Sequence, residues 1–523
     1  MSWTQFRRFF PVRNRLLLGI GIRDISPSLR YKSGTRPGVD LGAVTEEAVG
    51  DQKSVEDIPG YGFLSSIYWY FIKGFHEKTH ELQIVHKKKY GPIWKSSLGN
   101  NVVIHVANSD MIEEILRQEG KYPIRAQMPH WREYREIRGH AYGPLCEYGQ
   151  EWNHMRSMLN PKLLKPKEVS NYSPAINKVV TDFMQKIHWL RQTQGGGLMV
   201  YDIATHLYNF AFEGICTILF ETRMGCLEET IPEETQKFIA AVFEMFYTSS
   251  ILPLLPKAMW QYIPIWKRFI AAWDYIFYIS EKLINKKMKD IQEKMEKGLE
   301  VQGEYLTYLL TNTKMTPWDI YGSLSELLTA AVDTTSNTTS WILYNLAKEP
   351  SIQQQLYEEI NSVIPGDQIP LTKDFSHMPL LKAVVKETLR LYPVVPGNAR
   401  LVEKDLVIGG YHFPKNTLFH LCHYAVSLDD SSFVEPQRFQ PERWLRDMTR
   451  EKKPHPFASI PFGFGTRSCL GKRVAELEMY SVISRLIKHF EVRPDPSGKV
   501  VTTKTRTLLA PGGSIDLQFI DRM

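Results

Sequence analysis

Cysteine is scarce in this chain, and its placement argues against two common uses of the residue. The 523 residues contain only five cysteines: Cys146, Cys216, Cys226, Cys422 and Cys469. They are scattered and odd in number, and no two form a C-x-x-C pair. Neither a disulfide framework nor a zinc site is therefore favoured. This usage fits a reducing compartment best.

Acidic residues are nearly absent from the first 36 positions. Asp24 is the one acid there, against eight basic residues: Arg7, Arg8, Arg13, Arg15, Arg23, Arg30, Lys32 and Arg36. This segment alone accounts for the net charge of +7 of the whole chain, so the remainder is neutral. A neutral body argues against nucleic-acid binding, whose usual footprint is a basic surface.

The N-terminal segment also lacks a long apolar run. Leu16–Ile22 is too short for a secretory signal, and a membrane span needs about 20 apolar residues. Trp3, Phe6 and Phe10 fall on one helical face before Pro11. An arginine-rich, acid-poor composition is typical of a mitochondrial presequence, predicted over residues 1–36 with cleavage near 30–37. The alternatives are a disordered basic tail or a weak microsomal anchor.

Helical periodicity dominates the rest of the chain. A Gly/Glu/Asp-rich flexible linker is expected at 37–60, followed by one large domain over 61–523. Periods near 3.6 predict helices at about 107–119, 149–160, 167–191, 201–221, 233–248, 266–298, 315–348, 351–363, 378–391 and 470–489. Strand-like stretches are short, at 92–106, 398–413, 417–420 and 489–521. The predicted fold is mainly α with small β-sheets.

The most informative motif is the run from Phe462 to Gly471, which reads F-x-x-G-x-R-x-C-x-G. A lone cysteine is usually inert, but here Gly465 and Gly471 free the backbone, so that amide N–H groups can approach the sulfur of Cys469. Phe462 supplies an apolar wall and Arg467 a cation for a haem propionate. The run resembles the haem-binding signature of the cytochrome P450 superfamily. That resemblance implies haem b, held by the Cys469 thiolate between a long central helix and the cysteine loop.

A second motif lies within the predicted helix 315–348. Leu327–Thr335 resembles the family's A-G-x-D-T-T motif, with Ala331 in place of the usual glycine. Polar residues in a helix often only bond to the backbone. An acid followed by an alcohol also suits a proton relay, which predicts catalytic roles for Asp333 and Thr334.

Two further sets carry the resemblance. Glu387 and Arg390 form E-x-x-R, and Arg443 belongs to an F-x-P-x-R-W stretch; together they imply a buried network that supports the cysteine loop. Arginine binds carboxylates bidentately, and the resemblance places Arg156, Arg400 and Trp152 at the haem propionates beside Arg467.

A set of four basic residues indicates what kind of protein donates electrons to this chain. Lys382, Lys386, Lys472 and Arg473 could be a plain solvated face. In the mitochondrial members of the family such positions dock an adrenodoxin-type [2Fe-2S] ferredoxin, which an NADPH-dependent reductase serves.

The stretch 251–266 is apolar, interrupted by prolines and rich in tryptophan. It predicts a loop between two lid helices that touches the membrane through Trp260 and Trp266; packing in the core is the alternative. Val394, Val395, Leu508 and Leu509 are expected to line the substrate pocket.

Several blocks, among them Arg117–Pro123, Asp374–Ala383 and Leu391–Pro396, resemble the mitochondrial sterol 26-hydroxylase (27-hydroxylase) family. The resemblance implies O2-dependent hydroxylation of the terminal side-chain carbon of cholestane-type sterols for bile acid synthesis, of vitamin D3 at position 25, or of both. It also implies peripheral attachment to the matrix side of the inner membrane. The alternatives are a 25-hydroxyvitamin D 1α-hydroxylase, a retinoid desaturase, a haem-thiolate isomerase or dehydratase, and a non-catalytic haem sensor or carrier.

Overall fold

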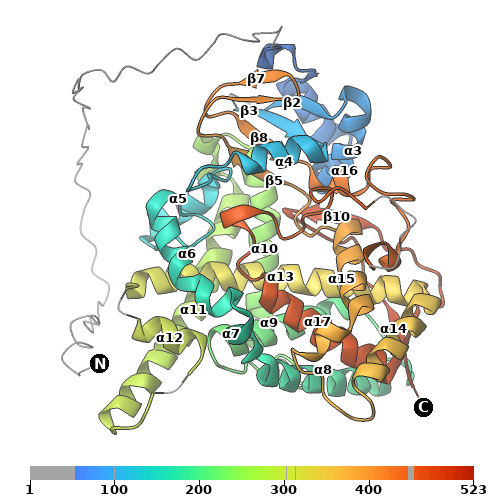
Figure 1. Cartoon of the computed structure of the whole chain (residues 1–523). Coiled ribbons are helices and arrows are strands. Elements are labelled where there is room, and N and C mark those ends of the chain that lie inside the picture. The colour runs from blue at the N-terminus through green and yellow to red at the C-terminus, as the bar shows by residue number, and fades with distance from the viewer. Residues whose placement is uncertain (1–52, 99–100, 302, 313, 446–452, 523) are drawn as a thin grey trace, which may run out of the picture.

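A computed structural model describes residues 53–98, 101–301, 303–312, 314–445 and 453–522 (Figure 1). The predicted presequence and residues 37–52 of the predicted linker lie outside these residues. Within them the chain forms a large helical body with a small five-stranded sheet at one end, at the top of Figure 1. The expected mainly α fold with small sheets is confirmed.

The helices carry most of the chain. They are α2 (Phe63–Ile67), α3 (Thr79–Tyr90), α4 (Ser109–Arg117), α5 (Pro129–Arg138), α6 (Gly149–Leu164), α7 (Pro166–Ser170), α8 (Ser173–Thr193), α9 (Ile203–Leu219), α10 (Glu233–Ile251), α11 (Pro264–Glu296), α12 (Tyr305–Thr311), α13 (Pro317–Lys348), α14 (Pro350–Val363), α15 (Pro379–Leu391), α16 (His423–Ser427) and α17 (Lys472–His489). The short single turns that matter below are η2 (Tyr68–Ile72), η5 (Lys257–Tyr262), η7 (Pro441–Trp444) and η8 (Gly465–Arg467).

The strands form four small sheets. They are β1 (Gly60–Tyr61), β2 (Ile93–Leu98), β3 (Asn101–Val106), β4 (Met199–Val200), β5 (Asn398–Leu401), β6 (Leu406–Ile408), β7 (Tyr411–Phe413), β8 (Leu418–Leu421), β9 (Phe490–Pro494), β10 (Thr503–Arg506), β11 (Leu508–Pro511) and β12 (Leu517–Asp521). The largest sheet has the order β1-β2-β3-β8-β5, in which β3 and β8 run parallel. The others are β4-β12-β9, the hairpin β10-β11 and the pair β6-β7.

Helix α13 crosses the middle of the helical body and organises it (Figure 1). It begins with a capping box, in which Thr316 accepts from the Asp319 amide and Asp319 accepts from the Thr316 amide; Pro317 stands at the first helical position. Most of its residues are buried, including the alcohols and acids of its central turns. A helix buried on nearly all sides holds its polar groups in fixed places.

One described helical segment, Glu233–Leu254, has the length and apolar composition of a membrane span. Of its most apolar window, 44% is buried inside the fold, and α10 packs against α11. Packing within the core therefore accounts for its composition.

Candidate functional site

The cysteine loop joins η8 to α17. Gly463 (φ 70°) and Gly465 (φ 69°) adopt left-handed conformations that favour glycine, and the Cys469 amide donates to the Phe462 carbonyl at 2.8 Å. Burial raises the pKa of the Cys469 thiol, but the amides of Gly471 and Lys472 donate to the sulfur and oppose this rise. The loop therefore presents a sulfur whose negative charge is already partly supported.

Four arginines gather beside this loop: Arg125, Arg156, Arg400 and Arg467. Burial and the other three arginines lower the pKa of Arg467 to about 9, and burial with its basic neighbours lowers that of Arg125 to about 10. Arg125 and Arg156 also support a thiolate at Cys469 electrostatically. Such crowding of buried cations indicates a site for an anionic group.

The hydrogen bonds of these arginines leave part of their donor capacity unused. Arg125 donates to the Arg467 carbonyl at 2.7 Å, and Arg156 donates to the Ser468 carbonyl at 3.1 Å. Among the described residues, the buried Nε atoms of Arg125 and Arg156 and the indole Nε1 of Trp152 have no partner. The Arg467 guanidinium lies over the Trp152 ring, 3.7 Å from its centroid.

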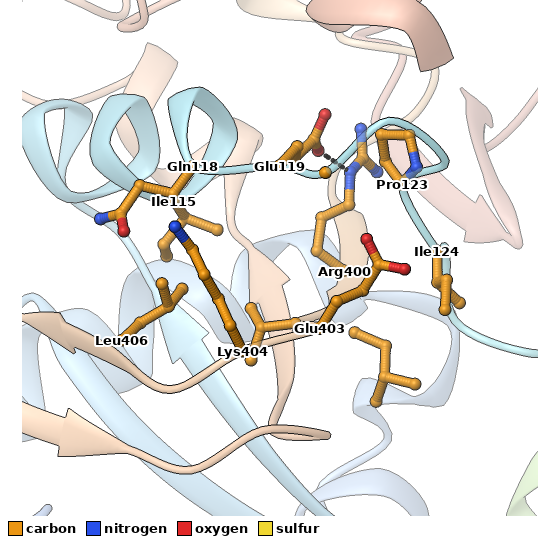
Figure 2. A pocket seen from close by; sticks show the side chains of 12 residues that line it. Ile115, Gln118, Glu119, Pro123, Ile124, Arg400, Glu403, Lys404 and Leu406 are labelled. Carbon is orange, nitrogen blue, oxygen red and sulfur yellow. Dashed lines mark hydrogen bonds and ion pairs between the residues drawn. The ribbon is translucent and has the colours of Figure 1, made fainter. Parts of the chain in front are cut away.

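Arg467 and Arg400 are more fully paired. Arg467 donates to the carbonyls of Pro123, Pro144 and Glu147 at 2.8 to 3.4 Å. Arg400 forms an ion pair with Glu119 at the wall of a cavity of about 230 Å³ (Figure 2). Only one acid is thus paired with this basic cluster within the described residues.

The arginines and the Cys469 sulfur fit a group that carries two carboxylates and a metal ion that binds sulfur, as haem does. Orphaned arginine donors suit propionates, and the supported sulfur suits iron. Sequence reasoning singled out Arg156, Arg400, Arg467 and Trp152 but missed Arg125. Its place two residues after the end of the Arg117–Pro123 block was the available signal.

Asp333 and Thr334 lie in consecutive positions of α13 and differ in their contacts. The Thr334 hydroxyl donates to the Ala330 carbonyl at 2.8 Å. The buried Asp333 carboxylate accepts from the Tyr208 hydroxyl at 2.5 Å and from the Asn337 amide at 3.2 Å. Burial raises the pKa of Asp333 above its ordinary value. Sequence reasoning missed Tyr208, because it comes from α9, far away in the chain.

Glu387, Arg390 and Arg443 are brought together where α15 packs against η7. Arg390 binds the Glu387 carboxylate through two bonds of 2.7 and 2.9 Å, and Arg443 binds it at 3.0 Å. The Trp444 indole and the Gln440 amide donate to the same carboxylate. Because Glu387 is fully buried, each donor offsets part of the cost of its charge.

The four residues of the predicted docking set, Lys382, Lys386, Lys472 and Arg473, lie at the surface. Burial and the nearby charge of Lys472 lower the pKa of Lys386, whose ammonium lies 3.9 Å from the Trp444 ring centroid. Burial raises the pKa of Glu476, and the charges of Lys472, Arg473 and Lys382 oppose this rise. Within the described ranges, none of the four basic residues forms an ion pair.

The prediction that Trp260 and Trp266 face a membrane is wrong. Their exposed fractions are 3% and 7%, and their rings stack on one another at 5.3 Å between centroids. The Trp260 indole donates to the carbonyls of Leu252 and Leu255, which folds the loop over its own aromatic side chains. The exposed apolar residues of η5 are instead Met259 and Tyr262.

The two segments predicted to contact substrate do meet. The Leu509 amide donates to the Val394 carbonyl at 2.8 Å, and Val394, Leu508 and Leu509 are buried, whereas Val395 is half-buried. The turn between β10 and β11 also reaches α10, because the Thr507 hydroxyl donates to the Phe246 carbonyl at 3.0 Å.

Comparison with known proteins identifies the class. The family model described as "Cytochrome P450" matches residues 59–519, and the chain belongs to this family of haem-thiolate monooxygenases. It is therefore an oxidoreductase that uses haem with a cysteine thiolate as iron ligand, together with O2, a lipophilic substrate and redox partners.

Individual relatives are similar over most of their length. The mitochondrial sterol 26-hydroxylase of Homo sapiens is 45% identical over 477 residues, 90% of each chain. Cytochrome P450 27C1 of Danio rerio is 40% identical over 90% of this chain and 87% of its own. The mitochondrial 25-hydroxyvitamin D-1 alpha hydroxylase of Homo sapiens is 42% identical over 90% of this chain and 94% of its own.

Proposed function

We propose that this chain is a mitochondrial monooxygenase that hydroxylates a sterol or secosteroid, with Cys469 as the iron ligand. The observation that carries the proposal is the supported sulfur of Cys469 beside buried arginines with unused donors. The names of two relatives, both hydroxylases of the mitochondrion, support the substrate class and the compartment. The terminal carbon of a sterol side chain is the preferred position, and vitamin D3 position 25 is the next.

The protein's part in the reaction is to hold the cofactor and to control protons. The bound haem supplies oxygen activation and oxidation of an unactivated C–H bond. Cys469 binds the iron, the amides of Gly471 and Lys472 support its charge, and Arg125 and Arg156 take the propionates with their free donors. Glu387 with Arg390 and Arg443 keeps the cysteine loop in place.

Proton delivery falls to the acid–alcohol pair of α13. Thr334 exchanges its bond to the Ala330 carbonyl for a water in the groove of the helix. Asp333, once its carboxyl group leaves the Tyr208 hydroxyl, delivers a proton to this water. The raised pKa of Asp333 lies closer to the value that a proton donor needs near neutral pH. Ala331 narrows the groove by one methyl group relative to glycine.

A small acidic ferredoxin of the adrenodoxin type is the proposed donor of electrons. The exposed residues Lys386, Lys472 and Arg473 and the half-buried Lys382, none of them ion-paired among the described residues, supply the complementary charge close to the cysteine loop. The exposed apolar side chains of α2 and η2, including Leu64 (79%) and Ile72 (73%), support peripheral contact with the inner membrane.

The test of substrate class uses the purified holoprotein with ferredoxin, its NADPH-dependent reductase and a panel of cholestane sterols, vitamin D3 and 25-hydroxyvitamin D3. Mass spectrometry of the products should show a hydroxyl on a sterol or secosteroid side chain. A product hydroxylated at the 1α position would move the chain to the vitamin D alternative. No oxygenated product from any of them would contradict the proposal.

The acid–alcohol role has its own test. Thr334→Ala should uncouple the reaction, so that more peroxide and less product form for each NADPH consumed. The matched control is Thr338→Ala, one turn further along α13, whose hydroxyl donates to the Thr334 carbonyl. Equal coupling in the two variants would refute the role of Thr334.

A further inference from the structure

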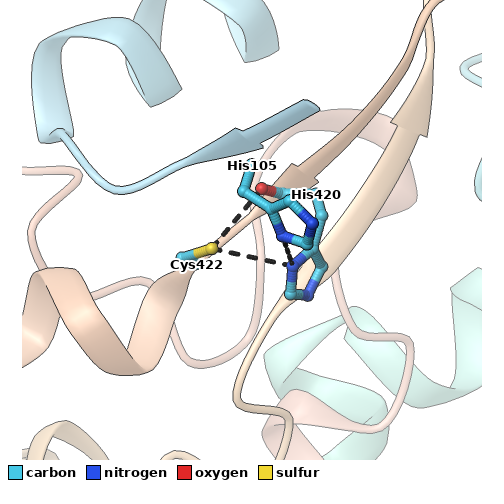
Figure 3. Close-up of side chains that lie close together, drawn as sticks. All are labelled: His105, His420 and Cys422. Atoms are coloured by element: carbon cyan, nitrogen blue, oxygen red, sulfur yellow. Dashed lines mark hydrogen bonds between the residues drawn. The ribbon is translucent and has the colours of Figure 1, made fainter. Parts of the chain in front are cut away.

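A cluster of metal-binding side chains lies in the five-stranded sheet, apart from the cysteine loop. His105 of β3 and His420 of β8 are direct neighbours in the parallel register. Cys422 lies just past the end of β8, at the N-cap of α16, with its sulfur near the His420 ring. One ligand atom from each of the three lies within 4.8 Å of the others (Figure 3).

We propose that His105, His420 and Cys422 bind Zn²⁺. The Nδ1 atoms of His105 and His420 are 3.1 Å apart, and the Cys422 sulfur is 3.6 Å from the His420 Nδ1. In a tetrahedral zinc site, the usual Zn–N and Zn–S bond lengths place two nitrogen ligands about 3.3 Å apart. They place a nitrogen and a sulfur ligand about 3.6 Å apart. The two distances that involve His420 are therefore already close to those that zinc requires, and the third ligand pair lies within 4.8 Å.

The second ring nitrogen of His105 is also placed as in a zinc site. Its Nε2 lies 2.7 Å from the Ser96 hydroxyl, on the adjacent strand β2. Once Nδ1 binds the metal, Nε2 carries the proton and donates to Ser96, the arrangement that orients ligating histidines. The ring is further fixed by stacking on Trp94, with 5.2 Å between centroids and 3° between planes.

A cavity of about 160 Å³ opens beside the two histidines and leaves room for a water as fourth ligand. Its lining includes Gln83 and His86 of α3. The buried Nε2 of His86 has no partner among the described residues, so it is free to accept a hydrogen bond from that water. This unpartnered atom is an independent sign that the cavity holds a polar occupant.

Protonation is compatible with binding. Both rings bind the metal in their neutral form, as ligating histidines do. On binding, the thiol of Cys422 releases one proton to solvent. The proton held between the two Nδ1 atoms moves to an Nε2 atom of the same ring, so that both Nδ1 lone pairs face the metal.

The haem iron provides an internal standard for the test. Holoprotein equilibrated with buffered Zn²⁺ and freed of excess metal should contain zinc and iron in a ratio close to one by elemental mass spectrometry. X-ray absorption at the zinc edge should show one sulfur ligand with nitrogen ligands. Cys422→Ser and His105→Gln should each weaken zinc binding by about 100-fold or more, and Ser96→Ala by about 10-fold.

The matched control is Cys226→Ser, which removes another buried cysteine and should keep the ratio of the unmodified protein. The reduced, CO-bound spectrum reports whether each variant still folds and binds haem; if Cys422→Ser fails that check, His105→Gln decides. Zinc binding that is equal in His105→Gln and the unmodified protein would overturn the proposal. A zinc shell of oxygen ligands, or no zinc bound at all, would do the same.

Discussion

Cys469 and Cys422 are both embedded in the fold, yet their surroundings differ in charge. Around Cys469 the side chains are cationic arginines, and two backbone amides point at the sulfur. Around Cys422 they are imidazoles at the edge of a sheet, with the Lys87 ammonium nearby, and burial raises the pKa of the Cys422 thiol. The first setting offsets part of the cost of a negative charge on sulfur, whereas the second favours the protonated thiol until a cation replaces the proton. Charge in the surroundings, more than burial, separates the two roles.

The largest expected difference is that between the two cysteine-to-serine variants in haem ligation and hydroxylation. Cys469→Ser should abolish the long-wavelength Soret band of the reduced CO complex and all hydroxylation, because the thiolate ligand is lost. Cys422→Ser should keep both. The CO difference spectrum and product formation measure the result, and a normal band in Cys469→Ser would reverse the assignment of the two cysteines.

The arginines are the next part of the comparison to test. Arg125→Gln should release haem roughly 10-fold faster or more, since a charge-assisted hydrogen bond contributes about 1.5–3 kcal/mol. Transfer of haem to an apo-globin acceptor gives the rate. Arg138→Gln, which removes an exposed arginine paired with Asp274, is the matched control and should leave the rate unchanged. Equal rates in the two variants would argue against Arg125 as a propionate ligand.

A buried carboxyl behind Cys469 adds a pH effect. Burial raises the pKa of Glu478 on α17 to about 8, above the ordinary value of 4.5 that applies to the unfolded chain. The unfolded state therefore loses its proton first, and the free energy of unfolding falls as pH rises from 4.5 to 8, at no more than about 1.4 kcal/mol per pH unit.

Glu478→Gln should remove that contribution. Urea unfolding at pH 5.5 and pH 7.5 should show a smaller difference in the variant than in the unmodified holoprotein. The control is Glu296→Gln at the exposed end of α11, which should behave as the unmodified protein does. A difference as large in Glu478→Gln as in the unmodified protein would contradict a raised pKa.

The smallest expected effect is that of surface lysines near each cysteine on the ferredoxin concentration needed for half-maximal rate. Lys386→Gln, near the Cys469 loop, should raise the ferredoxin concentration for half-maximal rate by a few fold, because an exposed charge pair contributes about 1 kcal/mol or less. Lys415→Gln, at an exposed position of the turn that leads into β8 and on to Cys422, should leave it unchanged. A salt series separates the two, since only a docking charge changes the salt dependence.

Much of the helical framework could be predicted from the sequence, because long amphipathic helices such as α11, α13 and α17 repeat apolar residues every three to four positions. Helix α3 was missed. Its buried face contains His80, Gln83 and His86 beside Leu82, so its hydrophobic period is weak. A buried face made of polar residues is visible only once its tertiary partners are known.

The residues of the candidate site also differ in whether the sequence alone could predict them. Cys469, Arg467 and the acid–alcohol pair stand in short motifs, so the sequence predicts them directly. Arg125 and Tyr208 reach the site by tertiary folding alone. The proposed zinc site departs from the sequence expectation for the same reason: its ligands come from two strands that are more than 300 residues apart, with no local spacing to reveal them.

The bond between the Leu509 amide and the Val394 carbonyl has a consequence for how this enzyme family diversifies. It ties the tip of a short C-terminal hairpin to the segment after α15 through backbone atoms, while side chains of Thr503 and Thr505 in the same hairpin contact His80. The turn at Thr507 (φ 64°) then acts as an exchangeable template. If this tip lines the substrate pocket, as the sequence predicts, we expect new side chains here to change which carbon of a ligand is presented while the cysteine loop stays as it is.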